Sequence, residues 1–171
     1  IQRLMQPLGN RFLEKDRRVA FLSSHIREPR KTLYEAVEKV MPVTGFGAHF
    51  DKTIENHHLS GFLKFELLQE YGFNLCPENG LYPGYYTEKI PEAFNSGCLP
   101  ITWADENISI DFNPSAMINL QPLFKSDFRE LKEILLDKEK LETFQSQSLL
   151  QRSPSIEPLK DFLNLILNDL S

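Results

Sequence analysis

The chain has 171 residues, of which 41% are hydrophobic and 25% are charged, and this composition is typical of a globular domain with one core. The net charge of −5 argues against a broad basic surface for nucleic acid or anionic lipid, so any phosphate binding must come from a few placed cations. No apolar run reaches the roughly 18 to 20 residues that span a bilayer, and no secretory signal pattern opens the chain. The chain starts at Ile1 rather than Met, so we expect a piece of a longer protein that forms a single domain over residues 1–171.

Strands alternate with helices in the first part of the chain. Residues 18–24 are a short apolar run that ends in small polar side chains, which predicts a buried strand. Residues 29–40 place apolar side chains at helical spacing, with a proline in the first turn, and residues 61–70 predict a second helix. Between these helices, residues 41–47 predict a short strand that runs into a glycine turn, and residues 48–60 predict a polar loop.

A strand, a loop, a helix and a second strand follow in the middle of the chain. Residues 71–78 predict a buried strand, because a short apolar run ends there in Pro77. Residues 79–89 form a turn-rich loop, and we expect a helix to begin near Thr87, which is a good N-cap residue. Residues 98–103 predict the next strand, so this segment has the pattern of a βαβ unit.

The loop before this helix gathers side chains that suit a nucleotide. The first turn of a helix leaves backbone N–H groups unpaired and carries the positive end of the helix dipole, so it attracts phosphate. Lys89 adds a cation there, Glu88 offers a carboxylate to ribose hydroxyls, and Tyr85 and Tyr86 add phenols. The alternatives are an ordinary charged first turn for Glu88 and Lys89, and tyrosines that only cap the sheet, which is the interpretation we favour for Tyr86.

The last part of the chain is mostly helical by pattern. Residues 105–114 predict a short helix or turn, which leads into a strand at 115–120. Residues 126–136 and 138–150 then alternate apolar and charged side chains with helical period. Residues 155–171 predict an amphipathic C-terminal helix, and we expect these leucine-rich helices to pack in the core or against another domain.

The alternation of strands and helices predicts an α/β fold with a mostly parallel sheet flanked by helices. Ligands of such sheets bind at the carboxyl ends of the strands, and both polar clusters, 23–30 and 79–89, follow predicted strands. His25 is the histidine best placed to face a ligand there, although we favour a position away from it.

Cysteine and histidine give little support to a metal site. Cys76 and Cys98 lie on or beside predicted buried strands, so we interpret them as reduced core thiols rather than as a disulfide or a metal pair. His49, His57 and His58 lack Cys or carboxylate companions at ligand spacing, so a solvated loop is the preferred interpretation. We therefore expect no metal.

The chain carries a Tyr-x-Thr-Glu-Lys block within a Phe-Asn-Leu-Cys-x-Glu-Asn context, which is far more specific than a glycine-rich loop. With the segments that form this block, six segments resemble, in the same order, the α1,3-fucosyltransferase family and in particular its bacterial members. The resemblance covers residues 19–120 and implies a GT-B arrangement, with two Rossmann-like domains that face each other across a cleft. This chain would be the C-terminal domain, which holds the donor, and the acceptor domain with its general base has no visible counterpart. The segments are SSHIREPR at 23–30, VTGFG at 43–47, FNLCPEN at 73–79, GYYTEKI at 84–90, LPITW at 99–103 and DFNPS at 111–115.

The resemblance also implies roles for individual residues. Arg30 and Lys89 would contact the diphosphate of GDP-fucose, and Glu88 would accept hydrogen bonds from its ribose hydroxyls. These three would form the catalytic set, in which the two fixed cations near the leaving group, Arg30 and Lys89, stabilise the transition state of an inverting transfer more than the ground state. No cofactor is implied besides the donor substrate itself. The residues that would bind the donor are Ser24, Arg30, Asn79, Tyr85, Glu88 and Lys89.

The activity implied is a transfer of fucose from GDP-fucose to a glycan that contains N-acetylglucosamine, such as a bacterial surface polysaccharide. The enzyme would lie in the cytoplasm or at the periphery of the inner membrane, or in the Golgi of a eukaryote. This chain alone would turn over slowly, because the deprotonating group would come from the acceptor domain.

Two other functions remain open from the residues. One is a non-catalytic α/β binding or regulatory module of receiver type, although Ser23 and Ser24 stand where a receiver needs carboxylates. The other is a degenerate transferase that binds nothing. Arg30 also has a surface interpretation, because it lies in a charged run, and Glu78 is either a second pocket carboxylate or an ion-paired residue at a strand end.

Overall fold

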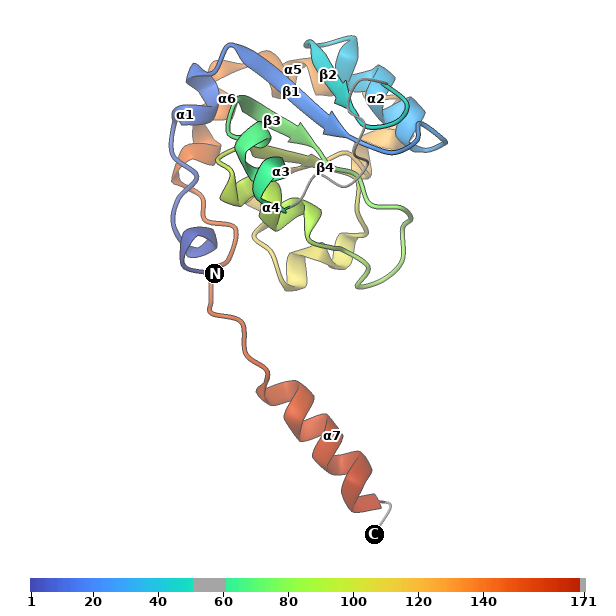
Figure 1. Cartoon of the computed structure of the whole chain (residues 1–171), viewed down its shortest axis with the longest axis vertical. Coiled ribbons are helices and arrows are strands. Elements are labelled where there is room, and N and C mark those ends of the chain that lie inside the picture. The colour runs from blue at the N-terminus through green and yellow to red at the C-terminus, as the bar shows by residue number, and fades with distance from the viewer. Residues whose placement is uncertain (51–60, 170–171) are drawn as a thin grey trace.

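The computed structural model describes residues 1–50 and 61–169, and its centre is a five-stranded parallel sheet (Figure 1). The strand order is β2-β1-β3-β4-β5, and every neighbouring pair is parallel. The predicted α/β class, with a parallel sheet flanked by helices, is confirmed. The strands are β1 (Arg17–Leu22), β2 (Val43–Phe46), β3 (Tyr71–Leu75), β4 (Leu99–Thr102) and β5 (Ile118–Asn119).

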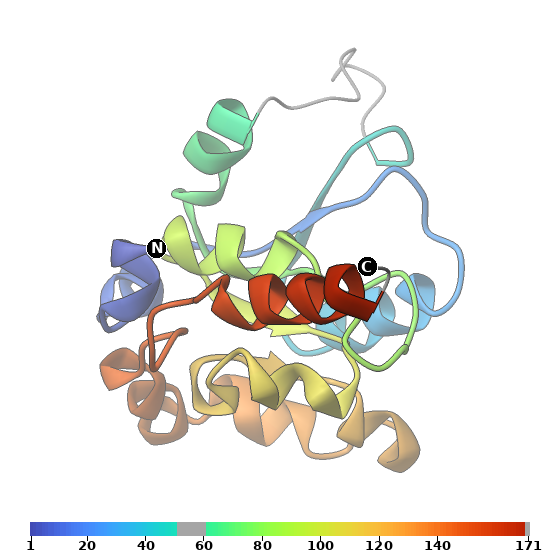
Figure 2. The ribbon, with the colours of Figure 1, turned by 90° about the horizontal axis from the view of Figure 1, so that it is seen from below.

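Three helices form the crossovers between the first four strands, and all three lie where a helix was expected. The chain moves from β1 to one side to form β2, and then returns past β1 to form β3 and β4. Because parallel crossovers are right-handed, this reversal places the first crossover helix on one face of the sheet and the other two on the opposite face. Figure 2 shows the latter two next to each other, and they are in contact. The helices are α2 (Arg30–Glu38), α3 (Gly61–Leu68) and α4 (Lys89–Asn95).

The reversal of direction creates a topological switch point between the carboxyl ends of β1 and β3. Ligands of open α/β sheets bind at such points, because the two connecting loops leave the sheet toward opposite faces and open a crevice between them. The sheet order therefore predicts where a site should lie before any side chain is considered.

The N-terminal segment, for which the sequence predicted no elements, packs against β3. Phe12 of α1 (Arg11–Glu14) is fully buried and packs edge to face on Phe73, with 5.7 Å between the ring centroids. Gly72 allows this approach, because a Cβ at that position would lie 2.3 Å from the carbonyl oxygen of Phe12. The core thus extends beyond the crossover helices to the start of the chain.

The two cysteines are reduced core thiols, as predicted. Both are buried and free of a disulfide, and burial raises the pKa of the Cys98 thiol to about 12. Burial also raises the pKa of Cys76, which lies just after β3. We therefore expect neither thiol to react readily, because the thiolate is the reactive form.

Regular structure after β4 is shorter than the periodicity predicted. The strand expected at 115–120 covers only the two residues of β5. The helix expected at 126–136 begins only at α5, because Asp127 and Phe128 have positive φ angles of 53° and 57°, which a right-handed helix does not accept. The remaining elements of this part are η2 (Glu106–Ile110), η3 (Pro114–Ala116), η4 (Pro122–Ser126), α5 (Leu131–Leu136), α6 (Lys138–Thr143) and η5 (Phe144–Ser146), and η1 (Gln2–Met5) opens the chain.

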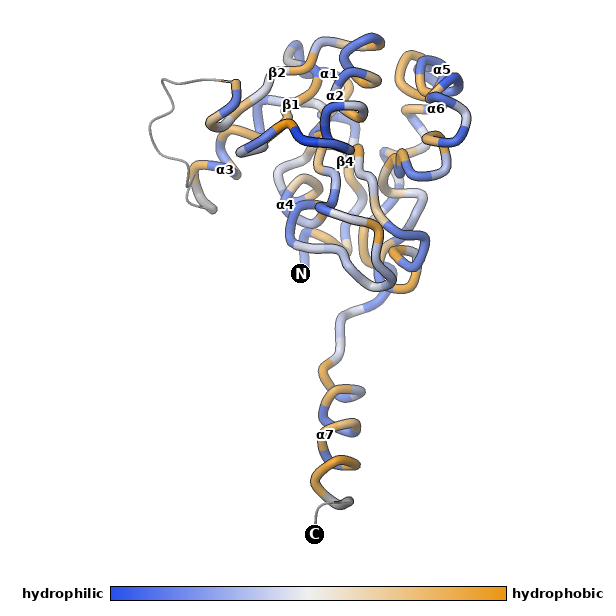
Figure 3. The backbone as a smooth tube through the Cα atoms, turned by 90° about the vertical axis from the view of Figure 1, so that its right-hand side faces the viewer, coloured by the Kyte–Doolittle hydropathy of each residue, from blue (hydrophilic) through white to orange (hydrophobic). Residues whose placement is uncertain are grey.

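The C-terminal helix α7 (Glu157–Asp169) forms as predicted but stands away from the sheet (Figures 1 and 3). Its apolar residues are exposed, so the expectation that it packs in the core of this chain is wrong, whereas α5 and α6 do contribute Leu131, Leu135 and Leu141 to the core. Packing of α7 against another domain stays a prediction. Among the described residues, no helix is both long and apolar enough to cross a membrane.

Candidate functional site

The segments that follow β1 and β3 meet at the switch point, as the sheet order requires. The turn after β2 supports the first of them: Ser23 N–H donates to Phe46 O over 2.9 Å, and Gly47, with a φ of +108°, passes so close that a Cβ would lie 2.3 Å from Ser23 O. This close backbone approach positions the end of β1 and the segment that leads into α2. Glycine is needed because an L side chain has no room there.

Arg30 is the central polar residue of the site. It is the first residue of α2 and is 9% exposed, and its guanidinium points back toward the sheet. Nη1 donates to Ser23 Oγ over 2.8 Å, Nη2 donates to Asn79 Oδ1, and Asn79 Nδ2 in turn donates to the Tyr85 hydroxyl over 3.1 Å. A continuous hydrogen-bond chain therefore joins the end of β1, the start of α2 and the loop after β3.

The charge of Arg30 has no carboxylate partner within ion-pair distance among the residues that the structure describes. Its hydrogen-bond acceptors are the neutral oxygens of Ser23 and Asn79. Burial lowers the pKa of Arg30, yet the guanidinium stays charged at neutral pH, because its ordinary pKa is above about 12. A buried cation with neutral partners is well suited to bind an anion.

Lys89 reaches the same region from the start of α4 and is held by a buried carboxylate. Glu78 is fully buried; its Oε2 lies 2.6 Å from Lys89 Nζ, and its Oε1 accepts the backbone N–H of Thr87 over 2.8 Å. The Thr87 hydroxyl contacts both Glu78 oxygens and also accepts from Lys89 over 2.9 Å. Two of the three ammonium donors of Lys89 are thereby used, and one is left for a ligand.

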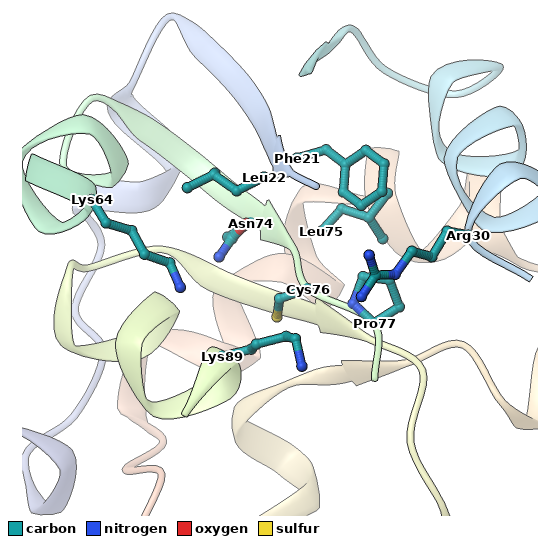
Figure 4. A pocket seen from close by; sticks show the side chains of 9 residues that line it. All are labelled: Phe21, Leu22, Arg30, Lys64, Asn74, Leu75, Cys76, Pro77 and Lys89. Atoms are coloured by element: carbon teal, nitrogen blue, oxygen red, sulfur yellow. The ribbon is translucent and has the colours of Figure 1, made fainter. Parts of the chain in front are cut away.

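Arg30 and Lys89 line one pocket of about 290 Å³, a volume that includes its opening to solvent (Figure 4). They enter it from α2 and α4, which lie on opposite faces of the sheet. Carboxylates are absent among the described residues that line this pocket, whereas a receiver-like site needs carboxylates to hold magnesium. The other lining residues are Phe21, Leu22, Lys64, Asn74, Leu75, Cys76 and Pro77.

A family model identifies the family of the chain. The model described as "Glycosyltransferase family 10 (fucosyltransferase) C-term" matches residues 12–146, which is most of the chain. The chain belongs to glycosyltransferase family 10. The resemblance found in the sequence motifs is therefore confirmed.

Individual relatives agree with the family. The family 10 domain is 34% identical, over 117 residues, to the α-(1,3)-fucosyltransferase FucT of Helicobacter pylori, an alignment that covers 68% of this chain and 23% of that protein. Crystal structures of an α1,3-fucosyltransferase with GDP-fucose and with GDP match it with TM-scores of 0.70 and 0.72, both at 27% identity. The two alignments cover 91% and 92% of this chain and 48% of each solved chain. This chain therefore spans about half the length of the solved relatives.

The donor residues predicted from the motifs fall into two groups. Arg30, Asn79 and Tyr85 are joined by hydrogen bonds, and Lys89 shares the pocket with Arg30. Their roles toward a ligand stay predictions. The other group, Ser24 and Glu88, consists of exposed residues whose side chains form no hydrogen bond with any described residue.

The helix α4 starts differently from the prediction. Glu88, not Thr87, occupies the N-cap position, and its side chain does not cap the helix. The reason is that Glu78 already accepts hydrogen bonds from the Thr87 hydroxyl and the Thr87 N–H, so Thr87 belongs to the loop. Of the two interpretations left open for Glu78, the ion-paired residue after a strand is the one that the structure supports.

Tyr86 and the histidines complete the comparison with the prediction. Tyr86 donates to Asp111 and packs on Phe112 with 5.6 Å between the ring centroids, and burial and this hydrogen bond raise its pKa to about 12, so it has a structural contact, as favoured. His25 is exposed, but its Nε2 lies 3.4 Å from Arg30 Nη1, which is closer to the site than we expected. His49 is exposed, whereas 57 and 58 lie outside the described residues; among those that are described, no group of three potential metal ligands occurs.

The sequence analysis missed two polar residues of the pocket, Lys64 and Asn74. Lys64 is one of two charged residues on the mostly apolar helix α3, and Asn74 lies inside an apolar strand. A polar residue in the middle of a fully buried strand is the one signal that could have identified Asn74, because buried polar side chains need a partner.

Proposed function

We propose that this family 10 domain binds GDP-fucose through its diphosphate and acts as the donor-binding half of an α1,3-fucosyltransferase. The observation that carries the proposal is that Arg30 and Lys89 come from helices on opposite faces of the sheet and line one pocket at the switch point. The solved relatives, which hold GDP-fucose and GDP, support the same ligand class.

The two cations suit the chemistry of the leaving group. In the transfer, the bond between the anomeric carbon and the diphosphate oxygen breaks and its electron pair passes to the diphosphate, so negative charge develops there. A fixed guanidinium and a fixed ammonium stabilise that charge without reorganisation, and one such donor contributes about 3 kcal/mol in typical enzymes. Arg30 offers a planar fork for two phosphate oxygens, and Lys89 offers a point charge.

The acceptor oxygen attacks from the opposite face of the sugar and must lose a proton. Glu78, the first candidate for a base within this chain, does not suit that task, because it is fully buried and both of its oxygens accept hydrogen bonds from Thr87 or Lys89. We therefore assign the base to a part of the enzyme outside this pocket. The purified domain should bind the donor but transfer fucose very slowly.

The positions of three further side chains around the pocket indicate the remaining contacts with the donor. Glu88 is exposed at the start of α4, next to Lys89, and is free to accept hydrogen bonds from the ribose hydroxyls. Asn79 and Tyr85 would hold Arg30 in place and line the path of the nucleotide. The acceptor that we propose is a glycan with N-acetylglucosamine, and the proposed location is the cytoplasm or the periphery of the inner membrane of a bacterium.

Isothermal titration with GDP tests the proposal directly. We expect the wild-type chain to bind GDP at least tenfold more tightly than UDP, and Arg30→Ala and Lys89→Ala to lose at least tenfold in affinity. Lys138→Ala is the matched control, because Lys138 is a highly exposed lysine on α6 and should leave binding unchanged. A wild-type chain that binds no GDP, or equal losses in the control, would overturn the proposal.

A further inference from the structure

Two residues of the pocket, Lys64 and Asn74, have no assigned role. We propose that they form a second anion-binding element of the donor pocket, which holds the terminal phosphate of the diphosphate together with Arg30 and Lys89. This inference rests on the proposed function and deepens it, because it assigns further positioning residues to the leaving group.

Asn74 is a buried amide without its full set of partners. It lies in the middle of β3, is 2% exposed, and its Oδ1 accepts no hydrogen bond from any described residue. Figure 4 shows its amide nitrogen directed toward the side of the pocket where the ammonium group of Lys64 lies. An apolar residue would suit this strand position better, so the amide calls for an explanation. Oδ1 is an acceptor and lacks a donor, which the Lys64 ammonium can supply, whereas the amide N–H groups can donate to an anion.

Lys64 points into the same pocket from α3. Its ammonium pairs with Glu92 of α4, with side-chain exposures of 21% and 37%. Ion pairs of such partly solvated groups contribute little to stability, so a diphosphate can compete with Glu92 for this lysine. The two other donors of the ammonium are left for a phosphate oxygen and for Asn74 Oδ1.

The charges around the pocket match a diphosphate better with Lys64 than without it. Each of the three crossover helices contributes one cation: Arg30 from α2, Lys64 from α3 and Lys89 from α4. The two lysines have carboxylate partners and Arg30 has none among the described residues, so one positive charge is unbalanced. Once the bond to the sugar has broken, the terminal phosphate of the leaving group carries a charge of about −1.5 to −2 at pH 7, and release of Lys64 from Glu92 would supply the second positive charge.

The competing interpretation is that Lys64 only ties α3 to α4 through Glu92. Two variants separate the interpretations, because both break the ion pair but only one removes the cation. If Lys64 binds phosphate, Lys64→Met should weaken GDP binding about tenfold, whereas Glu92→Gln should leave it unchanged or tighten it. If the ion pair is a structural tie, both variants should weaken GDP binding alike.

The experiment is isothermal titration of the full chain with GDP and with GMP, together with thermal unfolding of each variant. We expect Lys64→Met to weaken GDP binding at least threefold more than GMP binding, because GMP lacks the terminal phosphate. Asn74→Leu should weaken GDP binding and raise the Tm, since it removes a buried acceptor that has no partner among the described residues.

The possible failures are distinguishable. If the wild-type chain binds no GDP, the proposed function fails and this inference fails with it. If it binds GDP and Lys64→Met binds equally well, or if Glu92→Gln loses as much as Lys64→Met, only the inference is overturned. If Asn74→Leu binds GDP as tightly as the wild-type chain and has a lower Tm, Asn74 is not part of the anion-binding element.

Discussion

The guanidinium of Arg30 donates a hydrogen bond to Asn79 Oδ1, although 49 positions separate the two residues in the chain. This bond crosses the switch point from the start of α2 to the loop after β3. It therefore fixes the direction of the cation before any ligand arrives, and such preorganisation lowers the cost of binding.

The first prediction concerns this bond. Asn79→Ala should weaken GDP binding about threefold to tenfold, because Arg30 loses the acceptor that orients it. Asn79→Asp should bind GDP more weakly still, since its carboxylate would neutralise Arg30 and compete with the diphosphate. Titration of both variants with GDP shows which of them binds more weakly. Equal or tighter binding by Asn79→Asp would show that Arg30 does not bind the anion.

The second prediction concerns the buried carboxylate of Glu78. Glu78→Ala should lower the free energy of unfolding by about 3 kcal/mol, because it leaves Lys89 and the Thr87 N–H without their partner. Glu142→Gln, which breaks an exposed ion pair on α6, is the control and should change stability by less than about 0.5 kcal/mol. Urea denaturation measures both. A similar small effect in the two variants would contradict the anchoring role of Glu78.

The third prediction is a pH dependence from His25. Burial, Arg30 and Arg27 lower the pKa of His25, so between that lowered value and the ordinary value of about 6.5 the unfolded chain binds more protons than the folded chain. Stability should therefore rise with pH through this window and fall on acidification. His25→Gln should reduce the difference in urea midpoint between pH 5.5 and pH 7.5. An unchanged difference would mean that other groups account for the whole effect.

The fourth prediction compares two neighbouring tyrosines. Tyr85→Phe should weaken GDP binding about threefold, because Asn79 loses a hydrogen-bond partner. Tyr86→Phe should leave GDP binding unchanged and cost about 1 kcal/mol of stability, because it removes only the hydrogen bond to Asp111. Titration and denaturation of the pair give both values. If Tyr86→Phe weakened GDP binding more than Tyr85→Phe does, the assignment of Tyr85 to the site would be wrong.

The regular elements of the sheet could be predicted from sequence because each has a local signal. Short apolar runs identified β1 and β3, and the period of the apolar residues identified α2 and α3. The positive φ angles at Asp127 and Phe128 carry no such signal, because neither is a residue type that marks a left-handed position as glycine does. The expected start of the helix at residue 126 was wrong for that reason, whereas its second half forms α5.

The site was predicted only where a motif marked it. Arg30 and Lys89 stood in segments that resemble a family, whereas Lys64 lies on α3, outside those segments. Its place in the pocket depends on the packing of α3 beside α4, which no local pattern records. Likewise, the choice between Glu78 as a pocket group and as an ion-paired residue required the position of Lys89 in space.

The unbalanced charge of Arg30 has a practical consequence for any binding measurement. Sulfate or inorganic phosphate in the buffer resembles one end of the expected ligand and should occupy the pocket at millimolar concentrations. Apparent affinities for nucleotide would then fall with sulfate more steeply than with chloride at equal ionic strength. Purification and titration in a chloride buffer are needed before a weak signal is taken as evidence of an inactive protein.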